Sequence, residues 1–323
     1  MEYKFNRIII DGNNLYHKCY SISLKKYVDN KDIIIKETIN FFIKILNSYI
    51  KRFLGDRGYI YILWDNPISK QKIRVTMDGS LIERKKIDPL YKLNRKKQDG
   101  AFYRGIDYLR VYLLNYKNNI YDLQITNFEA DDIVKGLIDY FKDKKITDRI
   151  LIISEDLDWA RCFDNNVFWY SKNKVYDKDI FLNEYKYIPN EKNIVMYKTI
   201  KGDKSDYIPC GIRNIKESDV LRIIDEFDDI YCFLGNYFKL HYLSDLIKEK
   251  IRLDKNRLIL NYQLVSFIPV DIQLIEKNLI PCKENETVLS ILNKFYGIKT
   301  DIKFYNNKKV ENESNFFKFN VSR

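Results

Sequence analysis

Three carboxylates lie within four positions, at Glu129, Asp131 and Asp132, where a stretch with helical spacing of apolar residues begins. Asn127 precedes this stretch and is the residue that we expect to cap the helix. Acids in a first helical turn can serve only to complement the helix dipole. At about 100° per residue, Asp132 points away from the apolar face that Glu129 and Asp131 flank, so the three are not expected to ligate one ion together. A metal site here needs further acids from elsewhere in the chain.

The rest of the composition narrows the chemistry that the chain can perform. Only two histidines, His17 and His241, occur among 323 residues, which disfavours a Ser-His-Asp triad or zinc held by histidine. The five cysteines are scattered without a C-x-x-C pair, as expected for free thiols in a reducing compartment. Catalysis must therefore depend on carboxylates with metal ions, or on lysine and tyrosine.

The net charge indicates a polyanionic partner. With 56 lysines and arginines against 45 aspartates and glutamates, the formal charge is +11. The alternative is a charge-rich surface that faces only solvent. The sequence has no run of about 18 apolar residues that would span a membrane, and the apolar stretch at 8–10 is too short for a signal peptide.

Short apolar runs predict a set of β-strands. The expected strands cover 7–12, 59–64, 122–125, 150–154 and 167–170, the first ending in a glycine turn at Gly12, and a helix is expected over 34–50. Strands that alternate with helices indicate a parallel sheet, whose functional crevice lies beyond the carboxyl ends of the strands. Four acids follow such ends: Asp11, Asp65, Asp156 and Asp158. One acid at a strand end is usually a turn residue, but three acid-ended strands around an acidic helix start indicate a site.

A strongly basic insertion separates the second and third expected strands. Residues 70–104 contain eleven lysines and arginines against four acids, which accounts for +7 of the net charge of +11. Within it, helical spacing places Lys92, Arg95 and Lys96 on one face, and Tyr91 is available to stack on a base. The alternative is a solvated loop. Its position beside a carboxylate crevice favours a role in holding phosphates.

After the expected strands the chain is predicted to be mostly helical, with helices over 218–227, 242–253 and 258–267. Asp203 and Asp206 precede these helices, three positions apart, and could share a face that points back at the crevice. The alternative is a capped turn in which the acids have ordinary turn roles.

Clustered carboxylates repel one another unless cations offset the repulsion. Hard divalent ions with oxygen ligands, Mg²⁺ or Mn²⁺, suit such a site. Two such ions about 4 Å apart can activate a water and stabilise the leaving oxygen of a phosphodiester. On chemistry alone, the carboxylates and the basic insertion indicate a metal-dependent nuclease, with a metal-dependent phosphatase as the second choice.

Six separated motifs occur in the order found in a known family. They are Ile10-Asp11-Gly12-Asn13-Asn14, Trp64-Asp65, Tyr91-Lys92-x-x-Arg95, Glu129-Ala130-Asp131-Asp132, Ser154-x-Asp156-x-Asp158-Trp159 and Lys201-Gly202-Asp203-Lys204-Ser205-Asp206. Over about residues 7–270 the chain therefore resembles the 5′ nuclease, or flap endonuclease, family of 5′-3′ exonucleases, and looks most like the bacteriophage members, including the RNase H type.

The resemblance implies an α/β fold with a PIN-like, mostly parallel sheet flanked by helices, a basic helical arch, and a C-terminal helical domain with a degenerate helix-three-turn-helix. It divides the chain into a nuclease domain over 1–190 with the arch at about 70–104, a helical DNA-binding domain over 191–304, and a flexible tail over 305–323.

The resemblance also implies roles for individual residues, all acids being both catalytic and metal-binding. The first metal cluster is Asp11, Asp65, Glu129 and Asp131, with Asp132 as a further acidic partner, and the second is Asp156, Asp158, Asp203 and Asp206. Lys92 and Arg95 match catalytic residues that steer the scissile phosphate. The other substrate-binding residues are Tyr91, Lys96, Lys85, Lys86, Lys201 and Lys204.

The implied cofactors are two Mg²⁺ ions, which Mn²⁺ can replace. The family's glycine-rich hairpin is eroded here at 210–215, which removes the basis for expecting its monovalent cation. The implied partners are branched or nicked duplex DNA and RNA-DNA hybrid with 5′ ends, together with a single-strand-binding protein or a sliding clamp. The chain is expected to be a monomer in the cytoplasm (that of the host cell if phage-encoded), with no membrane contact.

The implied function is that of a metal-dependent 5′-3′ exonuclease and flap endonuclease, which hydrolyses phosphodiesters at 5′ ends, flaps and RNA primers during DNA replication. Two alternatives stand beside it. One is a structure-specific DNA-binding protein with little catalysis, and the other is a PIN-type ribonuclease.

Overall fold

The computed structural model describes residues 4–27, 30–65, 84–92, 98–115 and 119–282, together with 285, 286 and 290. The expected tail at 305–323 lies outside this part of the chain, as do Arg95, Lys96 and the side chain of Lys85. Of the basic insertion at 70–104, the structure describes 84–92 and 98–104.

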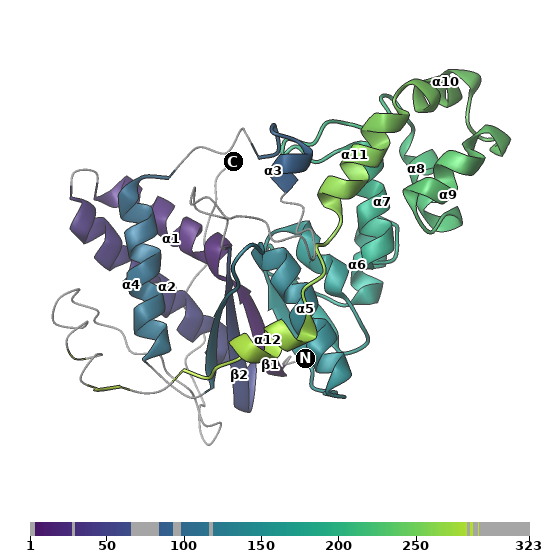
Figure 1. Ribbon diagram of the computed structural model, residues 1–323. Helices are drawn as coiled ribbons and strands as arrows, with labels where there is room; N and C mark the ends of the chain where they lie inside the picture. Colours follow the sequence, from purple (N-terminus) through teal and green to yellow (C-terminus); the bar gives the residue numbers. More distant parts are fainter. Residues whose placement is uncertain are drawn as a thin grey trace.

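Six strands form one sheet in the order β3-β2-β1-β4-β5-β6 (Figure 1). They are β1 (Phe5–Asp11), β2 (Leu54–Trp64), β3 (Ile120–Gln124), β4 (Ile150–Ile153), β5 (Val167–Ser171) and β6 (Lys174–Tyr176). The first five strands pair in parallel, and β6 returns antiparallel to β5. The five expected strands and their parallel arrangement are confirmed, whereas β6 was not expected. Because β2, β1 and β4 are neighbours, the acids that follow them emerge at one edge of the sheet.

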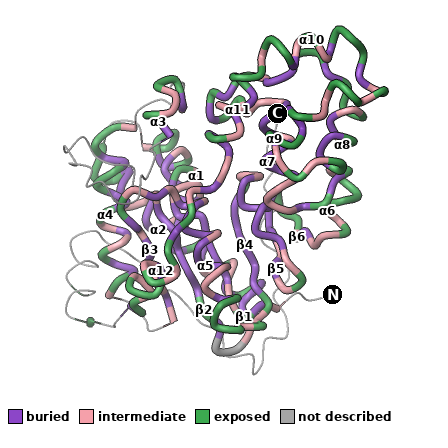
Figure 2. The backbone as a smooth tube through the Cα atoms, turned by 45° about the vertical axis from the view of Figure 1, so that its right-hand side comes forward, coloured by how far each residue is buried: buried purple, intermediate pink, exposed green. Residues whose placement is uncertain are grey.

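Helices cover both faces of the sheet (Figure 1). One face carries α1 (Gly12–Lys26), α2 (Lys31–Phe53) and α4 (Gly100–Leu114), and the other carries α5 (Ala130–Asp143) and α12 (Ile272–Asn278). Along β1, Ile8 and Ile10 pack into the apolar core on the α1, α2 and α4 side of the sheet, and Ile9 packs into the core on the α5 side. A strand between two helical layers needs apolar side chains on both sides, and Figure 2 shows the central strands buried.

Most of the described chain after β6 is helical, as expected. The helices that follow α6 (Lys178–Tyr185) are α7 (Glu191–Lys201), α8 (Glu217–Glu226), α9 (Ile230–Asn236), α10 (Asp245–Leu253) and α11 (Lys255–Val265), with a short 3₁₀ helix η2 (Tyr237–Lys239) after α9. Another short 3₁₀ helix, η1 (Leu157–Cys162), lies earlier, between β4 and β5. The apolar core on the α5 face of the sheet continues into α7, α8 and α9. None of the described helices is long and apolar enough to cross a membrane.

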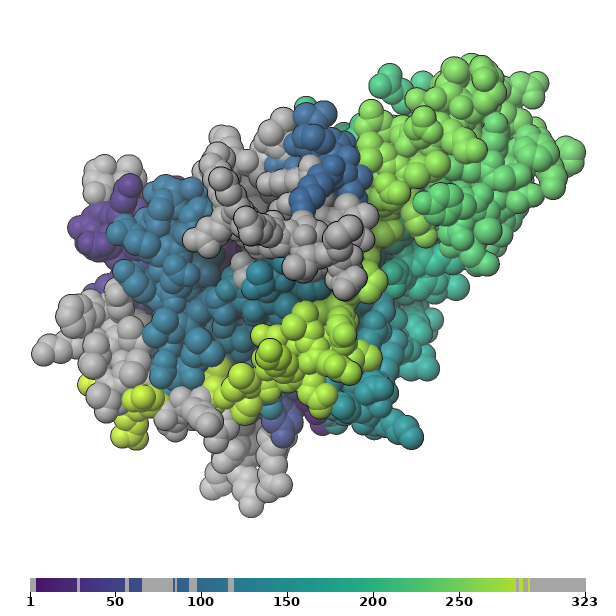
Figure 3. Space-filling view, in the orientation of Figure 1, coloured from purple at the N-terminus to yellow at the C-terminus, as the bar shows by residue number. Residues whose placement is uncertain are grey.

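A smaller apolar cluster joins the basic insertion to the helical part. It contains Tyr91 together with Val195 of α7 and Leu264 and Val265 of α11. The short helix α3 (Arg84–Ile87) contacts α11 beside this cluster, and Figure 3 shows the two segments against each other. The segment 84–92 of the insertion is therefore packed on the helical part.

The segment after β1 differs from the glycine turn that the sequence predicted. α1 begins directly at Gly12, and Asp11 caps it by accepting a hydrogen bond from the Asn14 N–H at 2.9 Å. A Cβ at Gly12 would lie 2.8 Å from the Leu63 carbonyl oxygen. The glycine is thus needed for the close approach of α1 to β2.

Two further local predictions were wrong. The N-cap of α5 is Glu129. Asn127, which was the expected cap, has a φ of 72° and lies in the preceding turn. Lys92 has a φ of 55° and lies in a turn rather than in a helix, whereas Arg95 and Lys96, which the prediction placed on the same helical face, lie outside the described residues.

Candidate metal centre

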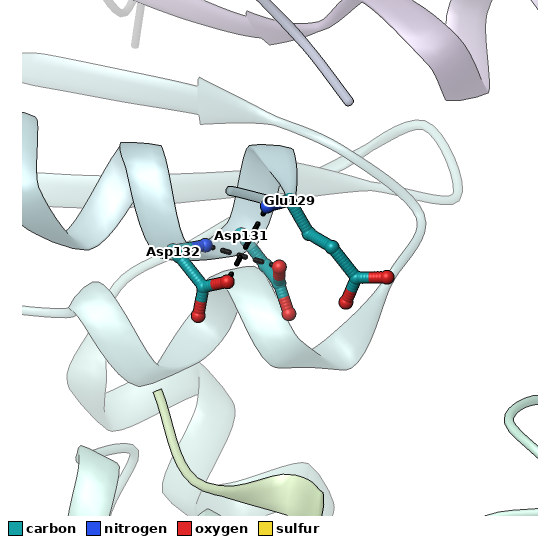
Figure 4. Close-up of side chains that lie close together, drawn as sticks. All are labelled: Glu129, Asp131 and Asp132. Carbon is teal, nitrogen blue, oxygen red and sulfur yellow. Dashed lines mark hydrogen bonds between the residues drawn. The ribbon is translucent and has the colours of Figure 1, made fainter. Parts of the chain in front are cut away.

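The first acidic cluster lies where α5 begins, and its three carboxylates point the same way (Figure 4). One oxygen each of Glu129, Asp131 and Asp132 lies within 4.8 Å of the other two. The expectation that Asp132 points away from the other two carboxylates was therefore wrong. It assumed a single helical wheel, whereas Glu129 is the extended cap residue, with φ −83° and ψ 159°.

Asp65 and Asp11 approach this cluster from the ends of β2 and β1. Asp65 Oδ1 accepts a hydrogen bond from the Ala130 N–H at 2.8 Å, which ties β2 to the start of α5. Asp11 Oδ2 accepts from Ser154 Oγ at 2.8 Å, at the end of β4. Burial raises the pKa of Asp11 to about 7, and the charges of Asp65 and Asp156 act in the same direction. The convergence predicted from the parallel topology is present.

A second acidic cluster forms where η1 meets the turn after α7. One oxygen each of Asp158, Asp203 and Asp206 lies within 4.8 Å of the other two. Asp156 caps η1 by accepting from the Asp158 N–H at 3.0 Å. Burial, together with the charge of Asp158, raises the pKa of Asp156 to about 6.

The turn after α7 presents its two acids through backbone pairing. Asp203 and Ile208 exchange two backbone hydrogen bonds, of 2.9 and 2.7 Å. Gly202 has a φ of +78°, and a Cβ there would lie 2.7 Å from the Cys210 nitrogen. The segment is therefore a turn, as one interpretation had it, and its two carboxylates also lie beside Asp158, as the other required.

A lysine from α7 lies inside the second cluster. Lys198 Nζ is 2.5 Å from Asp158 Oδ1 and 2.6 Å from Asp203 Oδ2. Although burial works against it, the cations Arg161 and Lys198 hold the pKa of Asp158 below its usual range. Sequence reasoning missed Lys198. The available signal was its place one turn after the apolar residues Ile194 and Val195 in α7.

The first cluster holds a buried cation as well. Arg84 Nη1 donates to Glu129 Oε2 at 2.6 Å, and Nη2 donates to Asp132 Oδ1 at 2.7 Å. Nη2 also donates to the Ser266 carbonyl at 3.0 Å, and Asp132 Oδ1 accepts from the Ile268 N–H at 2.8 Å. Asp132, expected to point away from the apolar face, is fully buried. Arg84, counted from the sequence among the basic residues available to phosphates, instead neutralises these acids.

Tyr91 and Lys92 join the two clusters. The Tyr91 hydroxyl lies 3.3 Å from Glu129 Oε2 and 3.1 Å from Asp206 Oδ2. Lys92 Nζ lies 2.8 Å from Glu129 Oε1 and 3.7 Å from Asp206 Oδ2. The clusters thus form one continuous centre. The expectation that Tyr91 is available to stack on a base was wrong, because its side chain is 4% exposed and packs against α7 and α11.

The charges of the centre fit divalent cations. Nine predicted carboxylates meet four cations, Arg84, Lys92, Arg161 and Lys198, which leaves five formal negative charges. Two divalent ions carry four positive charges, and oxygen donors are the ligands that Mg²⁺ and Mn²⁺ prefer. Donor type, clustering and charge therefore agree with a two-ion site.

The remaining predicted residues that the structure describes lie outside these clusters. Lys86 is exposed on α3, and Lys204 is exposed in the turn after α7. Lys201 pairs with Glu217 at 3.1 Å. Arg95, Lys96 and the Lys85 side chain belong to the part of the chain that the structure does not describe.

The chain is similar to known 5′-3′ exonucleases. Residues 6–186, more than half of the chain, match the 5′-3′ exonuclease N-terminal resolvase-like domain. The chain is 26% identical over 296 residues to a 5′-3′ exonuclease of Mycoplasmopsis pulmonis, covering 89% of this chain and 90% of that protein. It is 25% identical over 276 residues to DNA polymerase I of Caldicellulosiruptor bescii, covering 83% of this chain but only 30% of that polymerase.

A solved structure shares the fold. A variant of bacteriophage T5 flap endonuclease, in a pseudo-enzyme–product complex with DNA and metal ions, matches with a TM-score of 0.55 and 18% identity. The match covers 90% of this chain and 97% of that one. At this identity the likeness establishes the arrangement of a mostly parallel sheet flanked by helices, followed by a helical part.

Proposed function

The chain belongs to the 5′-3′ exonuclease family of metal-dependent nucleases, and from this premise we propose that it hydrolyses phosphodiesters at the 5′ ends and flaps of nucleic acids. The observation that carries the proposal is the meeting of two acidic clusters at one edge of a parallel sheet, joined by Tyr91 and Lys92. Carboxylates from five separate chain segments converge there, which ordinary turn or helix-cap roles do not require.

We assign the carboxylates to two divalent ions, Mg²⁺ with Mn²⁺ as a substitute. The first ion is held by Asp11, Asp65, Glu129 and Asp131, and the second by Asp156, Asp158, Asp203 and Asp206. Both oxygens of Asp132 already accept hydrogen bonds from Arg84 and from backbone N–H groups. We therefore give Asp132 the role of an acidic partner that fixes Arg84, rather than that of a direct ligand.

Divalent ions bound at these carboxylates would activate a water and stabilise the leaving oxygen of the phosphodiester. The residues of the chain supply the positioning. Lys92 Nζ lies between the two clusters, where a scissile phosphate that touches both would meet it. Arg95 is proposed to assist Lys92, and the exposed Lys86 and Lys204 to hold the flanking backbone, with Lys85, Lys96 and Lys201 in the same role.

The proposed arch, DNA-binding motif, domain limits, substrates and partners rest on the resemblance to the family. The basic insertion is proposed as an arch over the 5′ end, and the turns between α7 and α8 as a degenerate helix-three-turn-helix on the duplex. The domains proposed are 1–190, 191–304 and a tail at 305–323. The substrates proposed are nicked or branched duplexes and RNA primers met in replication, with a single-strand-binding protein or sliding clamp as partner of a monomeric enzyme.

Two alternatives predict different behaviour. A structure-specific DNA-binding protein with little catalysis would be expected to have lost a ligand, and all nine predicted acids are present. A PIN-type ribonuclease of the small kind would not need the second cluster or the helical part.

The test is cleavage of a 5′-labelled flap and of a nicked, RNA-primed duplex, with Mg²⁺, with EDTA, and with Mg²⁺ restored. We expect metal-dependent release from the 5′ side, and product lengths that separate flap cutting from exonuclease action. A matched 3′-labelled duplex controls for cleavage at the other end. Binding without cleavage on either substrate would favour the DNA-binding alternative, and cleavage of single-stranded RNA alone would favour the ribonuclease.

A further inference from the structure

Arg161 of η1 is a buried arginine that contacts both acidic clusters. Its Nη2 lies 3.4 Å from Asp131 Oδ2 in the first cluster and 3.6 Å from Asp158 Oδ2 in the second, and its side chain is 1% exposed. Tyr91 and Lys92 bridge the clusters through Glu129 and Asp206, so Arg161 provides a separate bridge through a different pair of acids.

The rest of the guanidinium is fixed by the backbone and by an aromatic ring. Nε donates to the Asp158 carbonyl at 3.1 Å, and Nη1 donates to the Val265 carbonyl at the end of α11. The guanidinium carbon lies 3.6 Å from the centre of the Phe267 ring. All three nitrogens are thus in use. The planar fork of arginine can make these contacts together, whereas the single nitrogen of a lysine cannot.

We propose that Arg161 is a positioning residue that sets the separation of the two metal clusters and whose fixed charge limits how strongly they bind divalent ions. This role rests on the proposed function, because it concerns the same carboxylates. Arg161 does not touch the expected path of the substrate, since it is enclosed by η1, α5 and the segment after α11.

The two parts of this role have different signatures. Removing the charge leaves the clusters more negative, so divalent ions should bind more tightly. Removing the fork frees the clusters to move relative to each other, so turnover should fall even when the ions are bound. A merely structural arginine predicts a different pattern, in which ion affinity and turnover fall together with stability.

The experiment compares Arg161→Gln and Arg161→Lys with the unchanged protein in three measurements. They are Mn²⁺ binding by calorimetry without nucleic acid, kcat and KM on the flap substrate at saturating Mn²⁺, and thermal unfolding in EDTA. Arg149→Gln is the matched control, because Arg149 also stacks on aromatic rings, those of Phe5 and Phe168, at the opposite end of β4.

For Arg161→Gln we expect the Mn²⁺ half-saturation concentration to fall roughly tenfold, as for one unit charge a few ångströms from a divalent ion. Its kcat should fall about 10- to 100-fold with little change in KM. Arg161→Lys should restore Mn²⁺ binding to that of the unchanged protein while its kcat stays low. Arg149→Gln should match the unchanged protein in Mn²⁺ binding and kcat.

Unchanged or weaker Mn²⁺ binding in Arg161→Gln would overturn the charge role, and an unchanged kcat would overturn the positioning role. If Arg161→Gln does not fold, Arg161→Lys decides alone, because a full kcat in that variant contradicts the need for the fork. If the unchanged protein cleaves no 5′-ended substrate, the proposed function fails, whereas Mn²⁺ binding still tests the charge of Arg161 by itself.

Discussion

Arg84 and Asp132 lie 48 residues apart in the sequence and form a two-pronged ion pair, with Nη2–Oδ1 and Nη1–Oδ2 distances of 2.7 and 3.1 Å. Asp132 is fully buried and Arg84 is 5% exposed. Although burial opposes it, the surrounding carboxylates hold the pKa of Arg84 above its usual value. The pair fastens α3, within the basic insertion, to the acidic start of α5.

Asp132→Asn should therefore destabilise the protein strongly. The substitution leaves the Arg84 charge buried with one carboxylate fewer, so we expect the free energy of unfolding to fall by about 3–5 kcal/mol. Urea unfolding in EDTA measures it. The control is Glu249→Gln, which removes an exposed partner of Arg252 and should leave the unfolding curve unchanged. Equal unfolding curves for the two variants would show that the Arg84–Asp132 pair contributes no more to the free energy of unfolding than an exposed ion pair does.

Asp156→Asn should greatly slow cleavage while binding of flap DNA persists. Asp156 follows β4 and caps η1 next to the second cluster, and we propose it as a ligand. Losing a ligand of a catalytic ion removes several kcal/mol of transition-state stabilisation, so kcat should fall roughly 100- to 1000-fold. Single-turnover cleavage with Mg²⁺ and DNA binding with Ca²⁺ separate the two effects. Normal turnover would remove Asp156 from the metal ligands.

The strands and the strand-end acids could be predicted from the sequence because both depend on local pattern and simple topology. The apolar run at 150–153 is a strand in any buried parallel sheet, and Asp11 and Asp65 then meet at one edge because parallel strands end together. The α5 acids were also recognised, but the cap was placed two residues early. A choice between Asn127 and Glu129 depends on backbone angles that neither residue type determines alone.

The internal cations could not be predicted in the same way. Arg84 has the same local sequence character as its basic neighbours, and its burial is decided by Asp132 and by the Ser266 carbonyl, 182 residues away. Arg161 likewise reaches the Val265 carbonyl across 104 residues. Tyr91 was assigned to the substrate for the same reason, since only the packing of α7 and α11 turns its ring inward.

The raised pKa of Asp11 should make the stability of the metal-free protein depend on pH. Burial raises the pKa of Asp11 from the ordinary 3.8 to about 7 because the folded protein favours the protonated carboxyl. The contribution of this group to the free energy of unfolding is therefore complete below about pH 4 and is lost as the pH rises through 7. At about 1.4 kcal/mol per pKa unit, the loss is up to about 4 kcal/mol. Asp11→Asn removes this titration, so the free energy of unfolding of this variant minus that of the unchanged protein should increase as the pH rises from 5 to 8.

Thermal unfolding in EDTA at the two pH values measures this difference. Saturating Mg²⁺ should reduce it, because a bound cation favours the ionised carboxylate. Asp225→Asn, which removes a carboxylate from an exposed position on α8, is the control variant. A gap between the Asp11 variant and the unchanged protein that stays constant from pH 5 to pH 8 would contradict the raised pKa.

Lys92→Ala should slow cleavage more than it weakens binding. Lys92 Nζ lies between Glu129 and Asp206 with its side chain 14% exposed, so it faces the centre rather than the bulk solvent. Removing a preorganised positive group from the reacting phosphate should lower kcat about 100-fold or more. Lys44→Ala, on the exposed side of α2, is the control. A purely weaker binding to DNA in Ca²⁺, with kcat retained, would make Lys92 a simple backbone contact.

Tyr91→Phe tests whether the hydroxyl that spans the two clusters matters for their arrangement. The ring should stay in place, because its apolar neighbours Val195 and Leu264 are unchanged. Only the contacts to Glu129 and Asp206, at 3.3 and 3.1 Å, are lost. Because the hydroxyl orients one proposed ligand from each cluster, we expect kcat to fall by about tenfold with KM nearly constant.

The stability of Tyr91→Phe should change by less than about 1.5 kcal/mol, the net value of an ordinary hydrogen bond. Tyr103→Phe removes a hydroxyl from a 54% exposed ring on α4 and should change neither kcat nor unfolding. If Tyr91 instead stacked on a substrate base, Tyr91→Phe would cleave normally, because phenylalanine stacks equally well, and Tyr91→Leu would raise KM. A loss of kcat in the phenylalanine variant therefore distinguishes a residue that orders the carboxylates from one that holds the nucleic acid.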